Sequence, residues 1–200
     1  MSLFVTFEGI EGCGKSTQVR LLATELTARD PLLIREPGGT QVGERVRDVV
    51  LHSDLEMTAE AEMYLYMAAR AEIVATRILP ALLEDRIVIA DRYHDSTLAY
   101  QGAGRGARTF WPPEFPIPDL TFLFALDPEV GLARHRGTGR PLDRLEREPL
   151  AFHRRVEEAY ERMAAAEPSR WVRLEADRPI AELHRDVMGH LEPLLAGVRA

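Results

Sequence analysis

The chain has 200 residues, 46% of them hydrophobic and 28% charged, and its formal net charge at pH 7 is -7. A chain of this length is the size of one domain and buries roughly 70% of its unfolded surface, so it needs no disulfide or structural metal. The acidic balance argues against a general nucleic-acid-binding protein, because such proteins present a basic face. The one cysteine, Cys13, excludes an internal disulfide and a zinc site built from cysteines.

The chain also lacks the sequence features of targeting or membrane segments. Its first residues, MSLFVTFEG, include no basic segment, and no later run of uncharged apolar residues approaches the length of a membrane span. We therefore expect a single cytoplasmic domain over residues 1–200, with no membrane and no nucleic-acid partner.

Short β-branched and aromatic runs alternate along the chain with segments of helical periodicity. Strands are expected at 3–7, 32–34, 87–90, 120–126 and 171–174. Helices are expected at 16–29, 42–51, 58–84 with a kink at Pro80, 96–101, from 130 onward, 152–166 and 180–195. Because the two kinds of element alternate and the strands are apolar on both faces, we predict an α/β fold. Its core would be a five-stranded parallel sheet flanked by helices.

The segment GIEGCGKS after the first strand fits the Walker A pattern at every fixed position. Its glycines let backbone N–H groups point inward at a phosphate, and the following helix offers its positive end. Lys15 would contact the outer phosphates, Ser16 would ligate magnesium, and Thr17 would hold an inner phosphate. The predicted ATP-binding residues are Gly9, Glu11, Gly12, Cys13, Gly14, Lys15, Ser16 and Thr17.

The alternative for this segment is a glycine-rich turn that binds nothing. Two observations oppose it: the motif lies between a strand and a helix, and Lys15 is the only lysine of the chain. Arginine is a poor replacement at this position, because the site needs a compact point charge. Cys13 lies where a thiolate would be favoured, but no base is spaced for cysteine catalysis, so we interpret it as a filler.

Two aspartates follow predicted strands. Asp91 fits a Walker B carboxylate that holds magnesium through water, and its alternative role is to cap the next helix. Asp127 begins an Asp-Pro-Glu sequence, which is typical of a helix start, so we interpret it as structural.

A phosphate-binding loop alone does not name an activity. A GTPase would need an Asn-Lys-x-Asp motif, but the chain has no asparagine and its lysine lies in the loop. The Ser-Gly-Gly signature of transporter ATPases is also absent from the sequence. These exclusions favour a kinase for a small acceptor, with a non-catalytic nucleotide-binding protein as the alternative from another class.

Five further stretches occur in the order in which bacterial thymidylate kinases carry them, and with the Walker A loop they resemble that family over most of the chain. They are Arg35–Thr40 (REPGGT), Asp91–Tyr93 (DRY), Ala99–Gly102 (AYQG), Gly104–Gly106 (GRG) and Leu142–Glu146 (LDRLE). The resemblance implies a P-loop kinase fold and transfer of the γ-phosphoryl group of ATP to thymidine 5'-monophosphate, with Mg2+. It also implies a homodimer. A kinase for a different nucleoside monophosphate remains the alternative within enzymes.

The resemblance further implies a set of substrate-binding residues. Among them, Arg47 and Arg92 would clamp the acceptor phosphate, Tyr66 would stack on thymine, and Arg70 would read its edge. Tyr100 would bar a 2'-hydroxyl. The full set is Glu11, which would hold the 3'-hydroxyl, Glu36, Arg47, Tyr66, Arg70, Arg92, Ser96, Tyr100 and Gln101.

Spacing supports part of this base pocket. Glu62, Tyr66 and Arg70 are four residues apart, which puts them on one helix face. Spacing alone would also fit Tyr66 as an ordinary core residue, because apolar residues surround it.

An arginine-rich segment at about 135–148 resembles the family's lid, whose arginines reach the transferred phosphoryl group. The P-loop here has no arginine, so the lid is the expected supplier. The candidate catalytic residues are therefore Lys15, Asp91 and Arg92, with Arg136, Arg140 and Arg144 from the lid. We interpret Arg134 and Arg147 as charged surface.

The chain departs from the family between Gly106 and Asp119. The family usually carries a longer helical segment there, whereas this chain has a shorter, proline-rich piece at 110–116. The departure spares the site positions named above, and it bears on the local helix and on any contact that this helix makes with a partner subunit.

Overall fold

The computed structural model describes residues 2–137 and 139–198. It contains one five-stranded sheet in the order β2-β3-β1-β4-β5, and every strand pair in it is parallel. The strands are β1 (Leu3–Glu8), β2 (Leu32–Arg35), β3 (Ile87–Asp91), β4 (Leu120–Ala125) and β5 (Trp171–Glu175). The predicted α/β fold with a five-stranded parallel sheet is confirmed.

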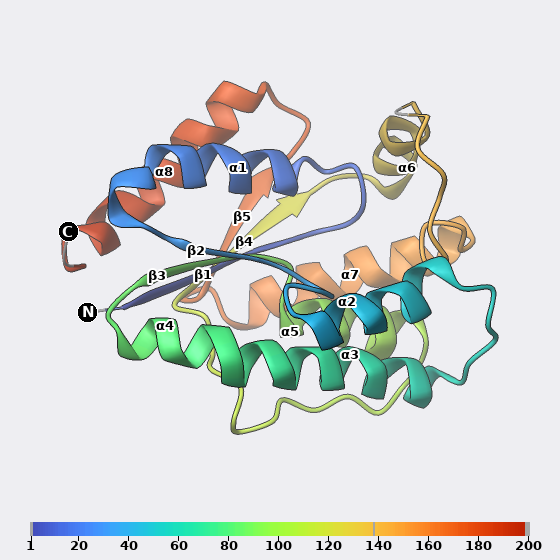
Figure 1. Ribbon diagram of the computed structural model, residues 1–200. Coiled ribbons are helices and arrows are strands. Elements are labelled where there is room, and N and C mark those ends of the chain that lie inside the picture. The colour runs from blue at the N-terminus through green and yellow to red at the C-terminus, as the bar shows by residue number, and fades with distance from the viewer. Residues whose placement is uncertain (1, 138, 199–200) are drawn as a thin grey trace.

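Helices cover both faces of the sheet, as Figure 1 shows: α1 and α8 lie on one face, and α3, α4, α5 and α7 lie on the other. The helices are α1 (Lys15–Glu25), α2 (Gln41–Arg47), α3 (Ala59–Ile73), α4 (Leu79–Leu83), α5 (His94–Thr97), α6 (Pro128–Arg136), α7 (Leu150–Ala166) and α8 (Ile180–Leu195). Parallel strands need this double cover, because both of their faces are apolar. Within the described residues, no helix is both long and apolar enough to span a membrane.

The central strand β1 leads directly into the Walker A loop. Every residue of β1, β3 and β4 is buried. Phe7 packs against Phe122 and Phe124 of β4, with ring centres 5.3 and 5.8 Å apart. In the register, Phe7 is also the partner of Asp91 at the end of β3. The carboxyl ends of β1 and β3 therefore lie side by side, at the edge of the sheet where α/β proteins bind their ligands.

The long helix expected at 58–84 is divided in the structure. α3 is followed by a π-helical segment at 74–78 and then by α4, with Pro80 near its start. Proline has no N–H to donate to the carbonyl four residues earlier, so the turn before it opens to the wider π geometry. The helix expected at 96–101 likewise begins earlier, as α5, and continues as a π-helical segment to Gly104.

Asp127 has the structural role that its sequence context predicts. Its side chain accepts a hydrogen bond from the backbone N–H of Glu129 (2.7 Å), and Pro128 is the first residue of α6. A side-chain acceptor at this position satisfies an N–H that the helix itself cannot pair.

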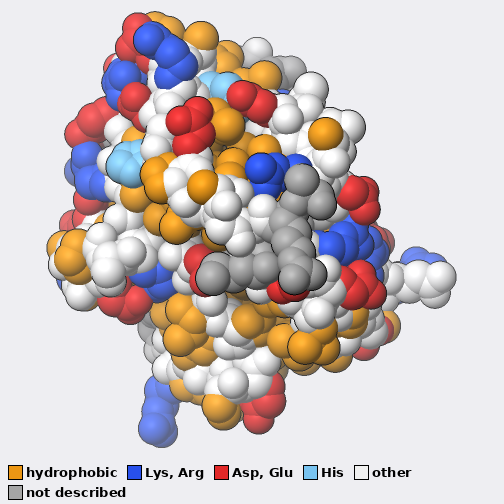
Figure 2. Space-filling model, turned by 90° about the vertical axis from the view of Figure 1, so that its left-hand side faces the viewer, with side chains coloured by type: hydrophobic (Ala, Val, Ile, Leu, Met, Phe, Trp, Pro, Cys, Tyr) orange, Lys and Arg blue, Asp and Glu red, His pale blue; other side chains and the backbone are white. Residues whose placement is uncertain are grey.

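Both chain termini lie at the end of the molecule opposite to the P-loop (Figure 1). Figure 2 looks onto that end and shows acidic and basic side chains interspersed over the visible surface. No continuous basic face is visible from this side, in keeping with the acidic net charge.

Candidate active site

Residues 9–14 connect the end of β1 to the first turn of α1, as the Walker A pattern predicts. Gly12 has φ 72°, and a Cβ there would lie 2.1 Å from the carbonyl oxygen of Gly131 on α6. Gly14 has φ 91° and open space where its side chain would be. The loop therefore packs tightly against α6 on one side and leaves its backbone accessible beside the start of α1, where a phosphate would bind.

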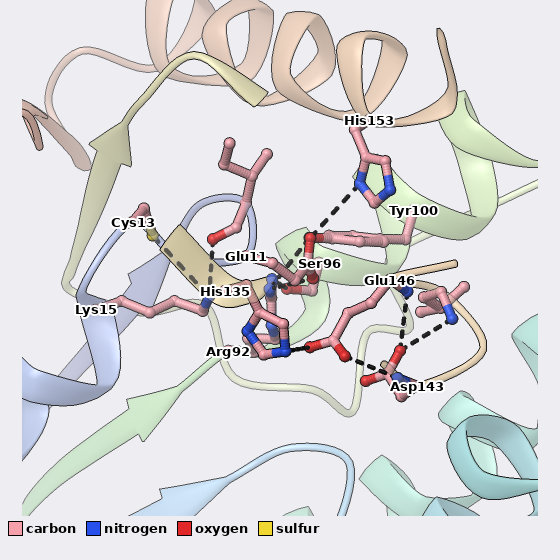
Figure 3. A network of polar contacts seen from close by, with 12 residues as sticks. Glu11, Cys13, Lys15, Arg92, Ser96, Tyr100, His135, Asp143, Glu146 and His153 are labelled. Atoms are coloured by element: carbon pink, nitrogen blue, oxygen red, sulfur yellow. Dashed lines mark hydrogen bonds and ion pairs between the residues drawn. The ribbon is translucent and has the colours of Figure 1, made fainter. Parts of the chain in front are cut away.

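Lys15 is folded over this loop. Its Nζ donates to the carbonyl of Ile10 (3.0 Å) and lies 4.0 Å from the Sγ of Cys13 (Figure 3). The side chain is buried. An ammonium has three N–H donors, so Lys15 can keep the Ile10 carbonyl and still bind phosphate oxygens.

Ser16 and Asp91 provide two adjacent oxygen ligands. The Ser16 hydroxyl donates a hydrogen bond to Asp91 Oδ2, and Asp91 ends β3. Asp91 does not cap α5, since that helix begins after Tyr93 and no side chain caps it. Residues 2–137 and 139–198 contain no cluster of three or more His, Cys, Asp or Glu that could hold a metal. The two oxygens suit Mg2+, which commonly takes one or two protein ligands, several waters and substrate phosphates.

Arg92 is the centre of a polar network beside the loop. It has a positive φ of 72°, which is unusual for a residue with a side chain and often marks a functional site. Its Nη2 donates to Glu11 Oε1 (2.9 Å) and to the Tyr100 hydroxyl (3.1 Å), and its Nη1 donates to Ser96 Oγ (3.1 Å). Figure 3 shows these four side chains converging from the P-loop and from the chain after β3. The structure thus brings together four residues that the sequence analysis selected.

Glu11 remains ionised within this network. Burial alone would raise its pKa, but the Arg92 guanidinium, His153, Lys15 and Tyr100 together hold the pKa well below its usual range. His153 reaches Glu11 from α7: its Nδ1 lies 3.7 Å from Glu11 Oε2, and the side chain is 1% exposed. A fixed negative charge therefore lies beside the phosphate-binding loop, where it can accept a hydrogen bond from a hydroxyl group but repels phosphate.

The residues that the resemblance assigns to the base lie together around α3. Glu62, Tyr66 and Arg70 are all buried on one face of α3. Arg70 donates from Nε to Glu36 Oε2 (2.7 Å), and Gln101 donates from Nε2 to Glu62 Oε1 (2.8 Å). Glu36 is therefore the ion-pair partner of Arg70, a relationship that the spacing of the two residues does not reveal.

A cleft of about 570 Å³ connects the P-loop, the Arg92 network and the residues around Arg70. That volume suits small-molecule ligands. The predicted site residues that line it are Glu11, Gly12, Lys15, Ser16, Glu36, Arg47, Tyr66, Arg70, Asp91, Arg92, Ser96, Tyr100, Gln101 and Arg140. Those that do not line it are Gly9, Cys13, Gly14, Thr17, Arg136 and Arg144.

The three lid arginines occupy different positions. Arg140 lines the cleft, donates to Glu146 Oε1 (2.8 Å) and has a side chain that is 59% exposed. Arg144 donates to Glu62 Oε2 and so fastens the lid segment to α3. Arg136 is exposed at the end of α6. The position of Arg140 is therefore the one that best fits contact with a ligand in the cleft.

Several side chains at the site were missed by the sequence analysis. His135 and Glu146 line the cleft from the lid segment, and His135 Nε2 lies 3.1 Å from Glu146 Oε1. Glu8, at the end of β1, accepts from the Tyr160 hydroxyl (2.8 Å) and from Ser96 (2.6 Å). The available signal for Glu8 was a carboxylate at the end of an otherwise apolar strand, next to the phosphate loop.

Burial, and next the nearby Asp95 carboxylate, raise the pKa of Glu8 from its ordinary 4.5 to about 7. The folded protein therefore holds this proton more tightly than the unfolded chain does. We expect the free energy of unfolding to include a contribution from Glu8 that is complete below pH 4.5 and is lost as the pH rises through 7. While Glu8 titrates, the free energy of unfolding should fall by at most about 1.4 kcal/mol per pH unit. Urea unfolding between pH 5 and 8 measures it.

The variant Glu8→Gln removes the titration and keeps the shape of the side chain. The wild-type and variant unfolding curves should diverge across this pH range, and the exposed α7 substitution Glu158→Gln should run parallel to the wild type. Parallel curves for Glu8→Gln would contradict the raised pKa.

A parallel sheet of this strand order, a Walker A loop after its first strand and an arginine-lined cleft beside that loop define a P-loop kinase. Residues 7–187 match the family described as thymidylate kinase. The chain belongs to the thymidylate kinase family.

Individual relatives agree with this assignment. The chain is 46% identical to a thymidylate kinase of Halothermothrix orenii, covering 92% of this chain and 94% of that protein. It is 47% identical to a thymidylate kinase of Pseudomonas fluorescens, covering 98% of each. Among solved structures, it resembles the thymidylate kinase from Ehrlichia chaffeensis with a TM-score of 0.75 and 30% identity, covering 96% of this chain and 98% of that one.

Proposed function

We propose that this chain transfers the γ-phosphoryl group of ATP to thymidine 5'-monophosphate, giving thymidine 5'-diphosphate and ADP, for dTTP synthesis. The observation that carries the proposal is the cleft that joins the P-loop to both the Arg92 network and the pocket around Arg70. A donor phosphate chain and an acceptor nucleotide can occupy one connected space there. Membership of the thymidylate kinase family supports the same reaction.

On the donor side, the backbone of the loop and Lys15 would bind the phosphates of ATP, with Thr17 near an inner phosphate. Ser16 and Asp91 would hold Mg2+ together with the phosphates, Asp91 through water. The ion supplies positive charge that offsets the charge of the phosphoryl group during transfer. The hydrogen bond between Ser16 and Asp91 supports this assignment, because it keeps both oxygens at one place.

On the acceptor side, Arg47 and Arg92 would bind the 5'-phosphate. Both line the cleft, and the guanidinium fork binds phosphate oxygens in pairs. Arg92 already shares its donors with Glu11 and Tyr100, so it is held rigidly before substrate binds.

Glu11 and Tyr100 would recognise the deoxyribose. The Tyr100 hydroxyl donates to Glu11 Oε1 (2.7 Å), which directs the remaining acceptor capacity of the carboxylate toward a sugar hydroxyl. Tyr100 would also exclude a 2'-hydroxyl by its bulk. Tyr66, Arg70 and Gln101 would contact the base, and all three line the cleft.

No protein nucleophile is needed, because an oxygen of the acceptor phosphate attacks the γ-phosphoryl group directly. The chain's contribution is to align the two phosphates and to neutralise the charge of the transition state. We assign the contact with the transferred group from the lid, residues 135–148, to Arg140. Closing the lid would exclude water and so limit hydrolysis of ATP.

The remaining parts of the proposal rest on family membership alone. Residues 1–200 would act as one kinase domain, with Mg2+ as the physiological metal. The protein would work in the cytoplasm as a homodimer.

The test is the rate of ADP formation from Mg-ATP with a panel of acceptors: the monophosphates of thymidine, deoxyuridine, cytidine, adenosine and guanosine. We expect a clear preference for thymidine monophosphate, and we expect chelation of the metal to abolish transfer. Preference for another acceptor would keep the kinase and overturn the base assignment. If ATP binds and no acceptor is phosphorylated, the protein is a nucleotide-binding module, and thymidine monophosphate should then fail to raise its melting temperature.

A further inference from the structure

The proline-rich segment at 110–116 makes no helix, yet it packs beside the base pocket. It belongs to the chain between Gly106 and β4, which runs along the bottom of Figure 1 past α3. The rings of Trp111 and Phe115 meet the His94 imidazole edge to face, with ring centres 4.6 and 5.8 Å apart. The Trp111 indole N–H donates to the carbonyl of Phe115 (3.0 Å), which closes the segment around the histidine.

His94 links this segment to Arg70. The side chain is 0% exposed, its Nδ1 lies 3.1 Å from Arg70 Nη1, and its Nε2 lies 2.8 Å from the carbonyl oxygen of Phe110. A guanidinium only donates and a carbonyl only accepts. The imidazole must therefore be neutral, with the proton on Nε2 and the lone pair of Nδ1 facing Arg70.

The remaining contacts of Arg70 show what this arrangement achieves. Besides His94, its guanidinium donates to Glu36 through Nε (2.7 Å), to Thr97 through Nη1 (2.7 Å) and to the carbonyl of Tyr93 through Nη2 (3.1 Å). Among the described residues, four of its five N–H donors are thus engaged, and one on Nη2 remains. These four bonds hold the last donor in a fixed direction. Arg70 lines the cleft, although the residue is only 1% exposed.

Burial and the Arg70 charge lower the pKa of His94 to about 3. The imidazole of His94 therefore stays neutral at pH values around neutrality. An imidazolium would place an N–H against the guanidinium and leave Arg70 Nη1 without one of its acceptors.

We propose that His94 is a positioning residue for the acceptor base: held by the Phe110 carbonyl, its Nδ1 fixes the Arg70 guanidinium so that one N–H meets a ring carbonyl of a pyrimidine. This inference rests on the proposed function, because it assumes that the base lies against Arg70. An N–H donor at that place favours the 4-carbonyl of thymine over the 4-amino group of cytosine.

Two substitutions separate this role from simple support of the segment. His94→Asn keeps an acceptor where Nδ1 lies and is too short to reach Phe110. His94→Gln can reach the Phe110 carbonyl with its amide N–H and places no acceptor at the Nδ1 position. KM and kcat are measured for thymidine monophosphate and for ATP, together with the ratio of kcat/KM for thymidine and deoxycytidine monophosphates.

We expect His94→Gln to raise the KM for thymidine monophosphate about tenfold to a hundredfold, because a charged donor loses its acceptor. It should also lower discrimination against deoxycytidine monophosphate, leave the KM for ATP unchanged, and differ from His94→Asn, which should change least. The opposite order of the two variants would overturn the proposal, since it would mean that only the bond to Phe110 matters. Equal changes in both KM values, or none, would also overturn it.

Thr97→Val supplies an arm that does not disturb the histidine, in case a His94 variant does not fold. It removes the other acceptor of Arg70 Nη1 and nearly conserves volume, so it should raise the same KM about tenfold. An unchanged KM in a folded Thr97→Val protein would contradict the positioning of Arg70 by these acceptors. The acceptor panel with the wild-type protein tests the proposed function separately from these variants. If another nucleotide is preferred, the proposed function is wrong, and the variants still report on Arg70 with that nucleotide.

Discussion

Lys15→Met should lower the rate of phosphoryl transfer about a thousandfold while the protein stays folded. Lys15 provides the only ammonium side chain of the molecule, and its Nζ is held over the P-loop by the carbonyl of Ile10. Methionine has a similar length and fills the same buried space, so the loss is confined to charge and hydrogen bonding. Removing one preorganised donor to a developing charge costs about 10² to 10³ in kcat. The assay is ADP formation at saturating ATP and acceptor.

Lys15→Arg is the matched control, because it keeps the positive charge. The planar fork of arginine is larger and differently directed than a compact ammonium, so this variant should recover only a small part of the rate. Full recovery would show that charge alone suffices at this position. Transfer close to the wild-type rate in Lys15→Met would contradict the assignment of the P-loop as the ATP site.

The parts of the fold that the sequence predicted are those set by local pattern. β1, β3 and β4 are apolar throughout and bury every residue, so their alternation with helices was enough to predict a parallel sheet. The Walker A loop was equally predictable, because its spacing, its preceding strand and its following helix all lie within a few residues. Pro80 was recognised as a disturbance, but the π-helical turns before it depend on how the backbone relaxes.

The parts that were missed depend on residues far apart in the chain. Glu8 meets Ser96 and Tyr160, which are 88 and 152 residues away, and a lone strand carboxylate gives no hint of those partners. Arg140 and Arg144 have the same side chain and lie in one short segment. Only the packing of the lid against α3 decides that Arg144 meets Glu62 while Arg140 lines the cleft.

All nine substrate-binding residues that the family resemblance named line the cleft, and the resemblance named them as ligands rather than as supports. Glu36 was selected as a substrate contact; in the structure it lines the cleft, is buried and is paired with Arg70. Supporting contacts of this kind involve two side chains that must be oriented together, and no single motif contains both.

Arg92→Ala should produce the second large loss, in activity and in stability together. The substitution removes a proposed phosphate ligand and leaves Glu11 charged, buried and without its guanidinium partner. Truncating one member of such a charge pair costs about 2–5 kcal/mol. We therefore expect kcat/KM for the acceptor to fall by about two to three orders of magnitude. The KM for ATP should change little, because the proposed role of Arg92 is to bind the acceptor phosphate. Urea unfolding should show a loss of about 3 kcal/mol.

The double variant Glu11→Gln/Arg92→Ala, compared with the single variant Glu11→Gln, separates the two effects. It removes the unpaired charge, so most of the lost stability should return while kcat/KM stays low, since no guanidinium is present to bind the phosphate. If activity returned together with stability, Arg92 would serve only to neutralise Glu11. If the single variant Arg92→Ala turned over normally, the acceptor phosphate would have to bind elsewhere in the cleft, and Arg47 would be the first residue to substitute.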